Sequence, residues 1–140
     1  MKPKTIKILY YIFTVLFALA MLADAYGGIT MQQAGTDSLA RLGYPMYLLV
    51  IMGSAKILGV AAILQTRYVA IKEWAYAGFT ISFVGAVLSW AAVAPDIANL
   101  VPPVVMLAIM LFTYYLWKKY EQVKDLEITN NTLAGNTEAA

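Results

Sequence analysis

The chain has 140 residues, enough for one domain, and 61% of them are hydrophobic, which exceeds the roughly 45–50% typical of soluble proteins. Together with a mean hydropathy of +0.69, this composition indicates a membrane protein. The net charge of +2, with no basic run that interleaves aromatic residues, excludes nucleic acid as a partner. Cysteine and histidine are both absent, which excludes disulfides, thiol relays and His-based metal or haem sites.

Four apolar stretches are long enough to cross a bilayer as helices, which takes roughly 20 residues at about 1.5 Å each. In chain order they run over residues 6–27, 46–64, 74–94 and 97–117. Continuous apolar runs favour helices over the alternating pattern of barrel strands. The sequence therefore predicts an all-α fold, an antiparallel four-helix transmembrane bundle within one membrane domain over residues 1–124.

The first stretch also resembles a secretory signal peptide, because a basic start and an apolar run precede the Ala23-x-Ala25 pattern of a cleavage site. The stretch is long enough to span the bilayer, which favours its retention. Cleavage would leave three spans in the same orientation, so topology does not distinguish a cleaved signal peptide from a retained first span.

Two polar segments lie outside the spans. Residues 28–45 form the longest external connection, in which Leu39, Leu42 and Tyr44 predict a short amphipathic turn ended by Gly43 and Pro45. Residues 125–140 have no apolar periodicity, so we expect a disordered cytoplasmic tail.

Basic residues set the orientation, since Lys and Arg in short flanks are retained in the cytoplasm. Of the ten basic residues, eight fall on one face: Lys2, Lys4, Lys7, Arg67, Lys72, Lys118, Lys119 and Lys124. We therefore expect a multi-pass protein of the cell membrane with both termini in the cytoplasm.

Two charged residues lie within predicted spans. Lys56 is close to the bilayer centre, where a charge costs about 2.5–3.5 kcal/mol on insertion scales, and Asp24 is about a turn from the external end of the first span. The Cα atoms differ in depth by about 10 Å, but side chains tilt toward the helix N-terminus, so these two lean toward each other. Three interpretations stay open: a direct or water-bridged pair, snorkelling of Lys56, and a ligand or proton role.

Small residues recur on one face of two spans. Gly53 and Gly59 flank Lys56 in the second span and turn it toward the bundle. The third span carries a longer stripe: Gly78, Ser82, Gly85, Ser89 and Ala92. Because small residues let membrane helices approach closely, the stripes predict helix packing.

Catalytic signatures are absent from the sequence, which contains no triad, phosphate loop or dinucleotide fingerprint. Asp24 and Asp96 have no second carboxylate beside them for acid-base work. We predict no catalytic residue and no metal site, and we disfavour an autonomous hydrolytic enzyme.

Four short motifs stand out: Leu42-Gly43-Tyr44-Pro45, Lys56-Ile57-Leu58-Gly59-Val60, Lys72-Glu73-Trp74-Ala75-Tyr76-Ala77-Gly78 and Gly85-Ala86-Val87-Leu88-Ser89. Together they resemble the DoxX-like family of small four-helix membrane proteins, over most of the chain except the tail. The namesake is associated with a thiosulfate to quinone oxidoreductase, so the resemblance implies a quinone cofactor by analogy alone. Many relatives have His after the serine of the last motif; this chain has Trp90, so a role that needs an imidazole there does not carry over.

Three hypotheses about function follow. The first is an accessory or structural subunit, linked by analogy to quinone-dependent electron transfer, whose partners are the lipid bilayer and other membrane subunits. The second is a small transporter or ligand-binding bundle with an internal cavity near Asp24, Lys56 and Trp90. The third is a quinone-site enzyme in which aromatic rings stack on the headgroup. A cavity beside Lys56 favours the second hypothesis, whereas a dry, tightly packed Lys56 favours the first.

Overall fold

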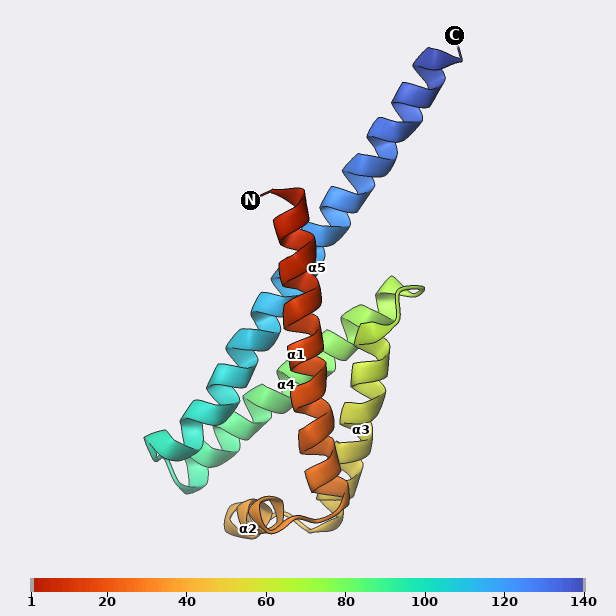
Figure 1. Cartoon of the computed structure of the whole chain (residues 1–140). Helices are drawn as coiled ribbons and strands as arrows, with labels where there is room; N and C mark the ends of the chain where they lie inside the picture. Colours follow the sequence, from red (N-terminus) through yellow and green to blue (C-terminus); the bar gives the residue numbers. More distant parts are fainter. Residues whose placement is uncertain (1, 140) are drawn as a thin grey trace.

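The computed structural model describes residues 2–139, and these form helices joined by short connections (Figure 1). In chain order the helices are α1 (Pro3–Ile29), α2 (Gln33–Leu42), α3 (Tyr47–Leu64), α4 (Val69–Val93) and α5 (Ile97–Glu138). Four of them, α1, α3, α4 and α5, are long and apolar enough to cross a membrane. The all-α prediction and the prediction of four spanning helices are confirmed.

The helix ends follow from residues that start or stop a helix. Pro3 lies in the first turn of α1, where its missing N–H has no helical acceptor to lose. Gly43 ends α2 with a φ of 77°, the left-handed conformation that glycine adopts without strain. The polar connection between the first two spans therefore contains a helix of 10 residues, longer than the predicted turn.

The C-terminal segment differs from the predicted disordered tail, because α5 continues as a helix to Glu138. Extending an existing helix avoids the cost of nucleation, and this outweighs the Asn, Thr and Gly residues of the segment, which are weak helix formers. The hydroxyl groups of three threonines bond to carbonyl oxygens four residues earlier in the helix, which satisfies these hydroxyls without strengthening the helix: Thr129, Thr132 and Thr137. Helix continuation thus outweighs the missing apolar periodicity.

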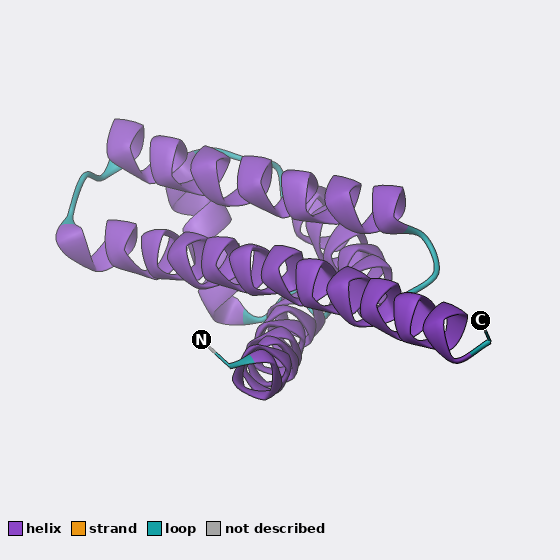
Figure 2. Ribbon diagram, turned by 90° about the horizontal axis from the view of Figure 1, so that it is seen from above, coloured by secondary structure: helices purple, strands orange, loops and turns teal. Residues whose placement is uncertain are grey.

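The α1–α3 pair and the α4–α5 pair lie close together at the end of the bundle that carries the termini and diverge from each other toward α2 (Figure 1). Seen from above, the helix that begins at the N-terminus is nearly end-on while α5 stretches across the view, so the two are strongly inclined (Figure 2). Buried aromatic residues fill the closely packed end, among them Tyr10, Phe17, Tyr76, Phe79 and Trp117. The helix inclination leaves room at the opposite end.

Two glycines of α3 sit at close helix contacts, as the small-residue pattern predicts. A Cβ added at Gly53 would lie 2.8 Å from Ile29 Cγ1 and 2.9 Å from the Ala25 carbonyl oxygen, both in α1. A Cβ added at Gly59 would lie 2.7 Å from the Phe79 ring of α4. Residues Gly53 and Gly59 therefore set how closely α3 approaches its two neighbours.

We expect Gly53→Ala to lower the free energy of unfolding by about 1–3 kcal/mol, because the added methyl group meets α1 backbone that cannot move aside. Gly78→Ala is the matched control, since its Cβ would meet no atom within 4 Å and Ala favours the helix. Unfolding of the purified protein in mixed detergent micelles measures both. Equal stability of the two variants would contradict the close α1–α3 contact.

Candidate functional site

A cavity of about 700 Å³ lies beneath α2, where the spanning helices separate. This volume is within the roughly 300–1,000 Å³ of small-molecule sites. Four helices supply its walls, through residues that include Asp24 and Gly27 of α1, Gly35 and Leu39 of α2, Met52 and Lys56 of α3, and Ser82, Gly85 and Ser89 of α4. We refer to it as the α2-end cavity.

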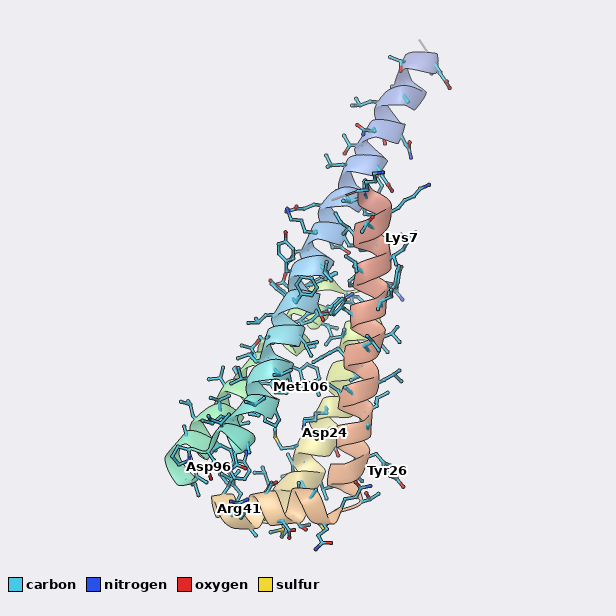
Figure 3. All side chains as sticks on the ribbon, turned by 60° about the vertical axis from the view of Figure 1, so that its left-hand side comes forward. Lys7, Asp24, Tyr26, Arg41, Asp96 and Met106 are labelled. Atoms are coloured by element: carbon cyan, nitrogen blue, oxygen red, sulfur yellow. The ribbon has the colours of Figure 1, made fainter. Side chains whose placement is uncertain are left out.

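Lys56 and Asp24 form an ion pair in the wall of the α2-end cavity, in which the Lys56 ammonium donates to Asp24 Oδ2. Figure 3 labels Asp24 on α1, beside α3. The side chain of Lys56 is 22% exposed and that of Asp24 is 55% exposed, so the pair is neutralised but not sealed from the cavity. Of the three interpretations from the sequence, the structure contains the direct pair.

Helix α2 covers the cavity, and polar contacts attach it to α4. The Tyr44 hydroxyl, just beyond the end of α2, is hydrogen-bonded to Ser89 Oγ of α4 at 2.8 Å. The Arg41 guanidinium lies 5.6 Å from the centre of the Trp90 ring, in cation–π contact. Figure 3 shows Arg41 near the α4–α5 turn that carries Asp96.

The three candidate site residues therefore have different positions. Asp24 and Lys56 are brought together in the cavity wall. Trp90 does not line this cavity and instead contacts Arg41, where it helps to attach α2 to α4. Four residues add hydroxyl groups to the site, and the sequence did not single them out as functional: Ser38, Tyr44, Ser82 and Ser89.

The small-residue stripe of α4 forms a cavity wall instead of a packed interface. A Cβ added at Gly85 would meet no atom within 4 Å, and the same holds at Gly78. Ser82, Gly85 and Ser89 line the α2-end cavity. The packing interpretation thus applies to the glycines of α3, whereas the α4 stripe keeps one side of the cavity free of large side chains.

A second polar feature, which the sequence did not predict, lies among the aromatic residues at the opposite end. Lys72 is 4% exposed, and its ammonium donates a hydrogen bond to the Tyr10 hydroxyl. The same ammonium lies 5.1 Å from the Tyr10 ring centre and 5.0 Å from that of Trp117. Lys72 thus links α1, α4 and α5 by a charge that we had counted only for topology.

Metal binding finds no support in this arrangement. Within residues 2–139, no three or more Asp or Glu side chains come together in a group that could hold an ion. The acidic member of the cavity, Asp24, is already paired with Lys56.

A model described as the DoxX-like family matches residues 12–113, well over half of the chain. The chain belongs to the DoxX-like family. It is accordingly a multi-pass membrane protein, and the resemblance inferred from the four motifs is confirmed. Searches of curated proteins and of solved structures gave no match.

The DoxX-like motifs supply residues to two parts of the structure, the α2-end cavity and the aromatic end of the bundle. Leu42 and Tyr44 of the first motif, Lys56 of the second, and Ser89 of the fourth all line the α2-end cavity. The third motif supplies Lys72 and Tyr76 to the aromatic end of the bundle. Motifs that lie far apart in the sequence therefore meet mainly around one cavity.

Proposed function

We propose that this DoxX-like protein is a ligand-binding membrane bundle that takes a small amphipathic molecule into the α2-end cavity. The single observation that carries the proposal is the position of the Asp24–Lys56 pair, in the wall of a cavity large enough for such a molecule. Intramembrane charges in a water- or ligand-accessible cavity are typical of functional sites. A tightly packed Lys56 would have supported a structural subunit instead.

The walls of the α2-end cavity suit an amphipathic ligand. The α2-end cavity has mostly apolar walls with a few hydroxyl groups, which suits an amphipathic guest. A smaller cavity of about 250 Å³ adjoins it between α3 and α4, shares Met52, Lys56 and Ser82 with it, and reaches Trp74 near the start of α4.

Filling the cavity tests the proposal. Gly85→Leu places a side chain in the α2-end cavity, where an added Cβ would meet no atom within 4 Å. Ala77→Leu is the control, because Ala77 is exposed on the same helix and lines neither this cavity nor the smaller one beside it. Both proteins and the wild type are purified in native lipid nanodiscs, and the bound small molecules are identified by mass spectrometry. We expect one class of molecule to be retained by wild type and Ala77→Leu and lost from Gly85→Leu. Identical contents in all three samples would refute the proposal.

An accessory-subunit role is a second candidate, supported by the part of α5 beyond the other helices. Its apolar side chains are highly exposed: Leu126 is 63%, Ile128 55% and Leu133 60% exposed. This surface suits contact with other membrane subunits, including quinone-linked ones. Co-purification of the full chain and of a chain ending at Tyr120 tests it, since subunits held by α5 should be lost only from the shorter chain.

We also propose that the protein lies in the cell membrane with both termini in the cytoplasm and α2 outside, on the strength of the eight basic residues. The chain has no native cysteine, so single cysteines give clean signals. We expect Ser38→Cys to react with a membrane-impermeant thiol reagent in intact cells, and Thr66→Cys to react only after lysis. Reaction of Thr66→Cys in intact cells would show that the protein has the opposite orientation.

A further inference from the structure

The α2-end cavity has a charge balance that restricts its ligand. Its lining contains one acidic residue, Asp24, and one basic residue, Lys56, and these are paired with each other. The other lining side chains are uncharged. The formal charge of the cavity is therefore zero.

A charged ligand would disturb this balance. An anion would compete with Asp24 for the Lys56 ammonium and leave the carboxylate without its partner, and a cation would do the reverse. Leaving one charge uncompensated in a site of low dielectric constant is costly. The paired state thus favours an uncharged ligand.

The pair nevertheless retains hydrogen-bonding capacity toward the cavity. One ammonium hydrogen of Lys56 is directed to Asp24 Oδ2, which leaves two further donors on Lys56 and the second carboxylate oxygen of Asp24. A hydroxyl group can accept from the ammonium and donate to the carboxylate at once. Ser82 lines the same cavity and can bond to a second hydroxyl group.

The rest of the lining determines the remainder of the ligand. Leu39, Leu42, Leu49, Met52 and Ile81 give an apolar surface that would bury a hydrocarbon chain. We propose that the α2-end cavity binds an uncharged amphiphile whose hydroxylated head group bonds to both Asp24 and Lys56 while its hydrocarbon chain packs on these apolar walls. This inference rests on the proposed function and specifies its ligand class.

Three photoreactive probes with the same ten-carbon chain test the inference, with a glycerol ester, a sulfate or a trimethylammonium head group. Each is added to the full-length protein in nanodiscs, and the cross-linked peptides are quantified by mass spectrometry. Competition by the same molecule without the photoreactive group separates saturable binding from partition into lipid. We expect the glycerol probe to label the α2-end cavity at a half-saturating concentration at least tenfold below those of the charged probes.

Three variants make the result specific. Gly85→Leu should abolish the saturable labelling and Ala77→Leu should retain it, because only the first places a side chain in the cavity. The double variant Asp24→Asn with Lys56→Met should weaken glycerol-probe labelling at least tenfold. Tighter labelling by the sulfate or trimethylammonium probe would overturn the ligand class and leave the proposed binding function standing. If no probe labels the cavity saturably, the ligand class is also overturned, and the molecules retained in native nanodiscs then decide whether the binding function survives.

Discussion

Lys56→Met and Asp24→Asn should each lower the free energy of unfolding by about 1–3 kcal/mol, and the double variant should recover part of the combined loss. Breaking a fully buried ion pair costs about 3–5 kcal/mol, because the remaining charge has no partner. Asp24 is 55% exposed, so the loss at this pair should be smaller. Each single variant leaves one charge within a membrane helix, whereas the double variant leaves none.

The measurement is a double-mutant cycle on the purified protein in mixed detergent micelles. Groups in direct contact deviate from additivity by about 0.5–3 kcal/mol, which is the coupling energy we expect for this pair. Ser54→Ala is a suitable control, since Ser54 is exposed on α3 and bonds only to the Val50 carbonyl of its own helix among residues 2–139. A double variant that loses the sum of the two single losses would show that Lys56 and Asp24 do not interact.

Lys72→Ala should destabilise the protein by about 2–4 kcal/mol. The substitution removes a buried stem and its cation–π contacts, each worth about 0.5–2 kcal/mol, and leaves the buried Tyr10 hydroxyl without its donor, at about 1–3 kcal/mol. Lys119→Ala is the matched control, because Lys119 is exposed and its ammonium lies 5.8 Å from the Tyr115 ring. Its effect should stay within about 0.5 kcal/mol.

Lys72→Met then separates packing from charge. Methionine keeps much of the apolar stem but donates no hydrogen bond to Tyr10, so we expect an intermediate loss of stability. Thermal unfolding in detergent ranks the four proteins. If Lys72→Ala and Lys119→Ala are equally stable, Lys72 is a surface residue and the aromatic contacts are incorrect.

Much of the fold was predictable because lipid imposes simple rules on sequence. Apolar length identified the four spans, and the tilt of side chains toward the helix N-terminus predicted that Lys56 and Asp24 lean together. Both inferences use local geometry alone. The structure contains the direct Lys56–Asp24 pair, which was one of the three interpretations of these charges.

The remaining features depend on distant parts of the chain. Lys72 precedes a predicted span and looks like a solvated flank, but it is buried by Tyr10 and Trp117 from two other helices. The spacing of Ser82, Gly85 and Ser89 shows that they share a face, yet not whether a neighbouring helix fills the space opposite. That depends on the inclination of the helices, which no local pattern encodes.

Thiol reactivity at Ser82 tests most directly whether the α2-end cavity is open to water and ligand. Ser82→Cys lies in the cavity wall, and Thr113→Cys, a fully buried position with 0% exposure, gives the closed reference. Reaction with methyl methanethiosulfonate requires the thiolate and hence access to water. We predict that Ser82→Cys in lipid nanodiscs reacts at least tenfold faster than Thr113→Cys. Equally slow reaction at both positions would show that the helices close on each other beneath α2, and would contradict a ligand cavity in this bundle.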